Sequence, residues 1–119
     1  MKLEDLVVYQ LAMEIGDEIY FMIEVWDSFA KWTTGKQLIE AADSIAANIS
    51  EGYGRFFYKE NRQFQYYSRG SQSETKTWLP KARNRKQIDE KYNELYAKLE
   101  ELGKRHNNYI KSIGLNPNE

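Results

Sequence analysis

Apolar residues recur at spacings of three and four along most of the chain, which is the period of an amphipathic α-helix. Only two prolines and seven glycines occur, and strong helix formers fill the intervals between them. The pattern therefore predicts an all-α protein. It divides into four helical segments, expected at about residues 5–29, 34–53, 59–80 and 89–113.

The first segment carries one apolar stripe, which consists of Val8, Ala12, Ile15, Ile19, Ile23 and Trp26. The sequence Trp32-Thr33-Thr34-Gly35 is expected to end it. Thr34 is followed three residues later by Gln37, a spacing that resembles a helix-capping box. We therefore expect the second helix to begin at Thr34.

The second segment is rich in small residues between Ala41 and Arg55. Its narrow apolar stripe consists of Leu38, Ala42, Ile45, Ile49 and Gly52. Small residues on a stripe allow another helix backbone to approach closely. Gly52 or Gly54 is expected to adopt the left-handed conformation that ends many helices.

The third segment has a less regular pattern. Its apolar side is expected to comprise Phe64, Tyr67, Ser71, Glu74 and Trp78. Gly70 and Ser71 lack bulk, as suits a point where another helix crosses. Pro80 is expected to kink or end the helix within one turn, ahead of a polar turn at residues 84–87.

The fourth segment has the most regular pattern in the chain. Its seam consists of Ile88, Tyr92, Leu95, Leu99, Leu102, His106, Tyr109 and Ile113. These positions alternate in spacing between four and three, as the a and d positions of coiled-coil packing do. Gly114 and Pro117 are expected to close the helix.

Short connections between four helices favour antiparallel neighbours. The predicted fold is thus an antiparallel, up-down-up-down four-helix bundle. A length of 119 residues suits a single domain. We expect the bundle to occupy residues 1–115 and residues 116–119 to form a polar C-terminal tail.

Charge is distributed unevenly although the net charge is only -1. Residues 1–54 carry three lysines and ten acidic residues, a net of -7, whereas residues 55–91 carry ten basic and four acidic residues, a net of +6. The chain contains no cysteine, which excludes disulfides and thiolate metal sites. Glu4 and Asp5 interrupt any signal peptide and the apolar runs are short, so a cytoplasmic protein without membrane association is expected.

Three motifs in the chain match those of a known family. Asp5-Leu6-Val7-Val8-Tyr9-Gln10-Leu11-Ala12 resembles the opening D-L-x-V-W/Y-x-x-A. Gln37-Leu38 together with Ala41 to Arg55 resembles the signature Q-L-x-x-A-A-x-S-I-x-x-N-I-A-E-G-x-G-R. Phe64, Gly70-Ser71 and Glu74 follow the pattern F-x-x-x-A-x-G-S-x-x-E. The chain thus resembles the bacterial four-helix-bundle proteins encoded in intervening sequences of 23S ribosomal RNA genes.

The resemblance implies a homopentameric bundle with no established biochemical activity. The family is itself similar to the accessory proteins of diversity-generating retroelements, which are pentameric and basic and which bind nucleic acid and a reverse transcriptase. Oligomerisation and nucleic-acid binding are accordingly the two functions that the resemblance brings forward.

A basic stripe on the third segment is the main candidate for contact with a partner. Lys59, Arg62, Arg69, Lys76 and Arg83 follow one another at spacings of three and then seven, so they share one helix face. Arg55 lies just before the stripe. Three interpretations remain open: a solvated helix face, a subunit contact that meets the acidic first helix of another copy, and an RNA- or DNA-binding surface. In the last case the exposed bases would stack on Phe56, Phe57, Tyr58 and Tyr66.

Asn48, Glu51 and Glu74 lie on or beside apolar stripes and are expected to form a structural polar network, with a small polar site as the alternative. His106, the one histidine, is expected in the core. No catalytic motif, metal-ligand set or cofactor motif is present. The predicted function is a non-enzymatic, cofactor-free, homopentameric interaction or scaffold module, and the alternative is a nucleic-acid-binding accessory protein.

Overall fold

The computed structural model describes residues 1–115, so the predicted tail at residues 116–119 lies outside the described residues. The described part is helical and contains no strand. In chain order the elements are η1 (Leu3–Asp5), α1 (Val7–Glu24), α2 (Ser28–Ala30), η2 (Lys31–Gly35), α3 (Lys36–Tyr53), α4 (Tyr58–Asn84) and α5 (Lys91–Ser112). The prediction of an all-α four-helix bundle is confirmed.

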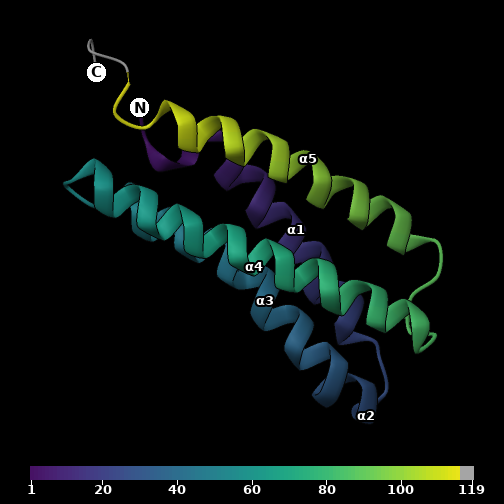
Figure 1. The fold of residues 1–119 in the computed structure, drawn as a ribbon. Coiled ribbons are helices and arrows are strands. Elements are labelled where there is room, and N and C mark those ends of the chain that lie inside the picture. The colour runs from purple at the N-terminus through teal and green to yellow at the C-terminus, as the bar shows by residue number, and fades with distance from the viewer. Residues whose placement is uncertain (116–119) are drawn as a thin grey trace.

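The long helices form an elongated bundle measuring 51 × 22 × 20 Å (Figure 1). Helix α1 packs against α3 and α5, and α4 packs against the same two helices. Neighbours run antiparallel, since Lys91 at the start of α5 pairs with Glu18, while Lys98 further along α5 reaches back to Glu14. Since the helices pack in the cyclic order α1, α3, α4 and α5, the groove between α1 and α3 lies on the opposite side of the bundle from the groove between α4 and α5.

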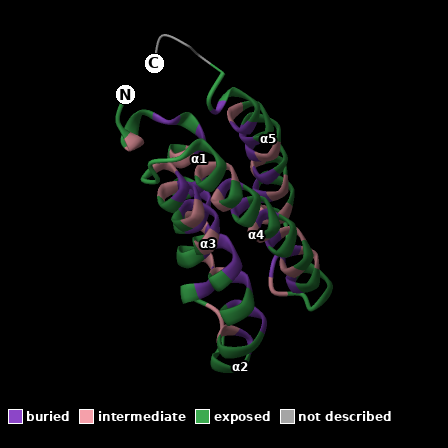
Figure 2. Cartoon of the chain, turned by 60° about the vertical axis from the view of Figure 1, so that its left-hand side comes forward, coloured by how far each residue is buried: buried purple, intermediate pink, exposed green. Residues whose placement is uncertain are grey.

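The apolar stripes predicted for α1, α3 and α5 all face the core, and the outer helix faces are exposed (Figure 2). Residues that are fully buried include Ile15, Ile19, Leu38, Ile45, Ile49, Leu95, Leu99 and Leu102. Burial of a large aliphatic side chain contributes about 1.5–3 kcal/mol. These three stripes hence supply most of the hydrophobic stabilisation.

The predicted boundary between the first two helices is wrong. Helix α1 ends at Glu24, and Asp27 caps the next helix by accepting a hydrogen bond from the backbone N of Ala30 at 3.0 Å. Helical backbone then continues through the π-helical η2 into α3. Thr34 is consequently not a cap but a buried residue inside this helix, because the stronger cap, Asp27, lies about two turns earlier.

The predicted role of Gly52 and Gly54 as left-handed caps is also wrong. Gly54 has a φ of -78°, and the one glycine of residues 1–115 with a positive φ is Gly114. A Cβ at Gly52 would lie 2.8 Å from the carbonyl oxygen of Asn61 and 2.6 Å from Nε2 of Gln65. Gly52 is thus required by the close approach of α4 to α3.

Helix α4 is rotated relative to the prediction. Tyr67 and Glu74 are exposed, and a Cβ at Gly70 would meet nothing within 4 Å. The buried face of the helix instead consists of Gln65, Ser68, Gln72, Thr75, Leu79 and Ala82. We call Gln65, Ser68, Gln72 and Thr75 the polar seam. The first three turn inward because partners in α3 and α5 satisfy them, whereas Thr75 donates to the carbonyl oxygen of Ser71 in its own helix.

Pro80, predicted to kink or end α4 within one turn, lies inside the helix, which continues for about one more turn and stops at Asn84. The predicted polar turn follows at residues 84–87. Lys86 adopts a left-handed conformation there, with a φ of 63°, which is unfavourable for a residue with a Cβ. The next residue of the core, Ile88, starts the seam of α5.

Candidate interaction surfaces

A chain of buried hydrogen bonds links α3, α4 and α5. Nε2 of Gln65 lies 3.1 Å from the carbonyl oxygen of Ile49 and 2.9 Å from Oδ1 of Asn61, so this amide nitrogen faces two acceptors. Its Oε1 therefore accepts from Nε2 of His106 at 2.8 Å. The opposite ring nitrogen, Nδ1, accepts from Nε2 of Gln72 at 2.9 Å. The contacts thus assign the proton of the neutral imidazole to Nε2.

His106 is fully buried, as predicted. Burial, together with the positive charge of Arg69, lowers the pKa of His106 to about 4. A proton added at Nδ1 would also face the amide donor of Gln72, so the surroundings accommodate the neutral form. The histidine is a structural link in the core.

This chain differs from the polar network expected at Asn48, Glu51 and Glu74. The amide of Asn48 donates to the carbonyl oxygen of Ser44 in its own helix, and Glu51 pairs with Arg55. Glu74 is exposed and lies about 20 Å further along α4 than Asn61, the residue that packs against Gly52. The three residues are not brought together, so the expected network and the polar site built on it are wrong.

The actual network has a signal in the sequence. Residues of the polar seam follow one another at spacings of three, four and three, the same spacing as the seam of α5. Because its members are polar, ranking the helix faces by hydrophobicity selects the wrong side. The hydrogen-bond partners of these polar residues can be identified only when the positions of α3 and α5 are known.

The predicted basic stripe is a continuous surface on α4. Arg62, Arg69, Lys76 and Arg83, which we call the basic ridge, follow the groove between α4 and α5 over about 32 Å. Tyrosine rings lie beneath the charges: the Arg83 guanidinium is 3.9 Å from the centre of Tyr92 and the Lys76 amine is 5.4 Å from the centre of Tyr96. Aromatic rings orient these cations without neutralising them.

The ridge has no carboxylate partner within residues 1–115, where the ion pairs that form involve other basic residues. At one end of the ridge, Arg62 donates to the carbonyl oxygen of Ile113 at 3.3 Å. Two predicted contact residues lie apart from it. Arg55 is bound to Glu51 at 2.6 Å and stacks on Phe64, and Lys59 is exposed at the start of α4.

The loop between α3 and α4 displays the predicted aromatic residues. Phe56 and Phe57 pack edge to face, and their exposed fractions are 89% and 62%. Tyr58 and Tyr66 are also exposed, and the guanidinium of Arg69 lies over the ring of Tyr66. Rings and cations thus occur together on this side of the bundle.

A groove of opposite charge lies between α1 and α3. Asp17 and Asp43 flank it, and its floor is formed by small residues that include Ala12, Gly16 and Ala46. The volume of this acidic groove is about 310 Å³. Burial and the nearby Asp17 carboxylate raise the pKa of Asp43. Neither aspartate forms an ion pair in the part of the chain that the structure describes, so both are available to a cation.

Two other acidic residues of α1, Glu14 and Glu18, are already neutralised. Nζ of Lys98 lies 2.7 Å from Glu18 and 3.1 Å from Glu14, and Lys91 lies 3.2 Å from Glu18. Although burial raises the pKa of Glu18, the hydrogen bonds from Lys98 and Lys91 hold it below its ordinary value. Within residues 1–115 the acidic residues of α1 that form no ion pair are thus Asp17, at the acidic groove, and Glu24, the last residue of the helix.

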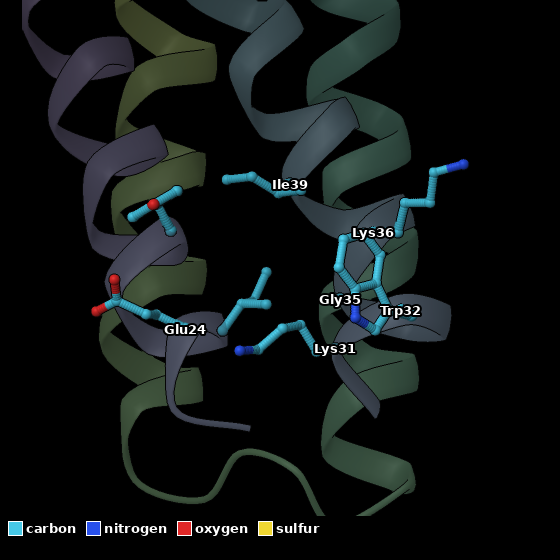
Figure 3. Close-up of a pocket in the computed structure, with 8 residues that line it drawn as sticks. Glu24, Lys31, Trp32, Gly35, Lys36 and Ile39 are labelled. Atoms are coloured by element: carbon cyan, nitrogen blue, oxygen red, sulfur yellow. The ribbon is translucent and has the colours of Figure 1, made fainter. Parts of the chain in front are cut away.

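An apolar pocket of about 290 Å³ lies at the α2 end of the bundle. Tyr20, Ile23, Trp32, Gly35 and Ile39 contribute to its lining. Figure 3 shows Lys31 extending across it toward α1, whereas the amine of Lys36 points away. Phe21, Val25 and Phe29, in the segment from the end of α1 to α2, have exposed side chains.

Two kinds of site are absent from residues 1–115. No helix there is long and apolar enough to cross a membrane. No group of three or more histidine, cysteine or acidic side chains is arranged to hold a metal ion.

The helix order, antiparallel registers and opposed charged grooves define an antiparallel four-helix bundle with segregated surface charge. The family model for 23S rRNA-intervening sequence proteins matches residues 4–108, and the chain belongs to this family. The predicted resemblance is confirmed.

The fold is also similar to a crystal structure of a protein with unknown function from the S23 ribosomal protein family of Bacteroides thetaiotaomicron. The two chains are 20% identical and superpose with a TM-score of 0.81 over 88% of this chain and 99% of the other. No match is found among curated proteins.

Proposed function

We propose that the protein is a non-enzymatic homo-oligomeric scaffold in which the basic ridge of one copy binds the acidic groove of the next. The supporting observation is the position of the two surfaces on opposite sides of one bundle, each without an intramolecular counter-charge within residues 1–115. Complementary patches of this kind produce head-to-tail association, and closure of such a chain gives a ring. A ring of five is the assembly that the family resemblance implies.

The contact is tested by measuring molar mass with light scattering at low salt. Asp17→Asn/Asp43→Asn removes the acidic groove, and Arg69→Gln/Lys76→Gln removes the basic ridge. Each double variant is expected to be monomeric alone, because a head-to-tail assembly needs both surfaces on every copy. An equimolar mixture is expected to form 1:1 dimers, since one intact ridge can still meet one intact groove.

Lys81→Gln is the matched control because Lys81 is an exposed cation on α4 outside the ridge. This variant is expected to keep the wild-type mass. A wild-type monomer at micromolar concentration and low salt would contradict oligomerisation. An oligomer that survives both double variants would instead assign assembly to a different surface.

A second candidate function is nucleic-acid binding along the basic ridge, favoured by the four unpaired cations and the exposed rings around them. Filter binding of structured RNA at low salt tests it. Arg62→Glu/Arg69→Glu is expected to abolish retention and Lys81→Glu to weaken it only slightly, and added salt is expected to weaken wild-type binding steeply. Equal effects of the two variants would contradict a role for the ridge.

A further inference from the structure

A cavity larger than the acidic groove and the apolar pocket lies at the end of the bundle that holds the N-terminus. Its volume is about 560 Å³, within the range of sites that bind small molecules. It is lined by Met1, Leu6, Tyr53, Arg55, Tyr58, Asn61, Tyr109, Ser112, Ile113 and Gly114. We call it the end cavity. Its residues come from the N-terminal segment, α3, the loop after it, α4 and α5.

Three tyrosine rings from three different helices line the end cavity, and each is held by a contact. The hydroxyl of Tyr53 donates to the carbonyl oxygen of Met1 at 2.5 Å. The ring of Tyr58 packs against Gly114, where a Cβ would lie only 2.9 Å away. The ring of Tyr109 stacks on His106 with 22° between the planes. Rings that are fixed in this way bind a planar ligand at low entropic cost.

The buried hydrogen-bond chain ends in the same cavity. Asn61 accepts from Gln65 through Oδ1, and its Nδ2 lies 3.5 Å from the hydroxyl of Tyr109. The amide nitrogen of Asn61 carries a second hydrogen, and the hydroxyl oxygen of Ser112 adds an acceptor to the lining. The cavity therefore offers the edge contacts that a heteroaromatic ring with N–H and C=O groups requires.

The charge of the cavity selects among planar ligands. Arg55 is the one charged side chain in its lining and is paired with Glu51, and no carboxylate lines the cavity, so a cationic ligand finds no counter-charge in the lining. Ile113, which lines the cavity, accepts the hydrogen bond from Arg62, the first cation of the basic ridge. A ligand with a neutral ring and an attached phosphate matches this arrangement, with the ring inside and the phosphate toward the ridge.

We propose that the end cavity binds a nucleobase, supplied either by a free nucleotide or by a single strand whose backbone follows the basic ridge. Stacking on aromatic side chains accommodates any base, and the Asn61 amide contacts its edge. This site goes beyond the proposed scaffold and does not depend on assembly. The single-strand form shares the ridge with the second candidate function, whereas the free-nucleotide form does not.

Calorimetric titration of the full-length protein with AMP, UMP and ribose 5-phosphate tests the proposal. Binding of at least one nucleotide is expected at about 1 mM or below, and ribose 5-phosphate, which lacks the base, is expected not to bind. Tyr58→Ala is expected to weaken nucleotide binding at least about tenfold through the loss of one stacking surface. Tyr67→Ala, at an equally exposed tyrosine of α4 outside the cavity, is the matched control.

The two sources of the base are separated by a single-stranded oligonucleotide and the ridge variant Arg69→Glu/Lys76→Glu. If a strand is the ligand, this variant loses oligonucleotide binding and keeps AMP or UMP binding. If free nucleotides are the ligand, the wild type binds the oligonucleotide no better than the mononucleotide. Equal binding of ribose 5-phosphate, no nucleotide binding, or equal effects of Tyr58→Ala and Tyr67→Ala would each overturn the proposal, whatever the fate of the scaffold.

Discussion

Nε2 of His106 donates to Oε1 of Gln65 at 2.8 Å, and both side chains are fully buried. Burial lowers the pKa of His106 to about 4, whereas the unfolded chain retains a pKa near 6.5. The unfolded state therefore binds the proton more tightly. The neutral histidine therefore makes its full contribution to the free energy of unfolding above pH 6.5. This contribution, about 3 kcal/mol, is lost as the pH falls from 6.5 to 4.

A single histidine makes this prediction directly measurable, because the imidazole gives one set of NMR signals. Its titration midpoint is expected near pH 4. A midpoint close to 6.5 would show that the ring is not desolvated as the structure indicates. Denaturant unfolding of His106→Leu should lack the histidine contribution to the pH dependence between pH 4 and 6.5.

Gln65→Leu is expected to lower the free energy of unfolding by about 2–3 kcal/mol. The substitution leaves the Nε2–H of His106 and the carbonyl oxygen of Ile49 without their buried partner. Gln63→Leu, at an exposed position two residues earlier, is the control and should change stability by less than about 0.5 kcal/mol. Urea unfolding measures both, and similar losses in the two variants would contradict the network.

Gly52→Ala and Gly70→Ala make the same chemical change in two helices and should have opposite effects. At Gly52 the new methyl group collides with backbone and side-chain atoms of α4, so we expect a loss of about 1–3 kcal/mol. At Gly70 the methyl group meets nothing, and higher helix propensity should add about 0.5–1 kcal/mol. Thermal unfolding distinguishes them, and stabilisation by Gly52→Ala would refute the close contact between α3 and α4.

Lys86→Gly is expected to stabilise the protein by about 0.5–1 kcal/mol, since glycine adopts the φ of 63° without steric cost. Lys86→Ala separates the conformational effect from the loss of charge, because alanine keeps the unfavourable Cβ. Chemical denaturation should show a gain for glycine alone. Equal stability of the two variants would place the origin of any change in the charge.

Three of the four long helices could be predicted in position and orientation from the sequence. The seams of α1, α3 and α5 are apolar, so the transfer free energy of their side chains determines which face is buried. The family signature is likewise local, because its residues lie within the single stretch from Gln37 to Arg55. Both the apolar seams and the family signature can be recognised from residues that lie close together in the sequence.

The rotation of α4 could not be predicted in this way. Its buried face is selected by hydrogen bonds from Gln65 to Ile49 and from Ser68 to Ile45, whose partners are 16 and 23 residues distant. The end of α1 was wrongly predicted because the capping-box spacing of Thr34 and Gln37 outweighed Asp27, whose side chain in fact caps the next helix. The proximity of Asp17 and Asp43 at the acidic groove also depends on tertiary structure, because the two residues lie on different helices.

The polar seam has a consequence for alternative packings of the bundle. An apolar seam can slip by a turn and still bury its surface, but the buried amides of Gln65 and Gln72 each meet their partners at one height only. A slipped α4 would leave Gln65 and Gln72 beside the leucines of α5, with their hydrogen bonds unmade. The seam thus excludes neighbouring alignments of the helix and keeps the rings and cations of its outer face in fixed positions along the molecule.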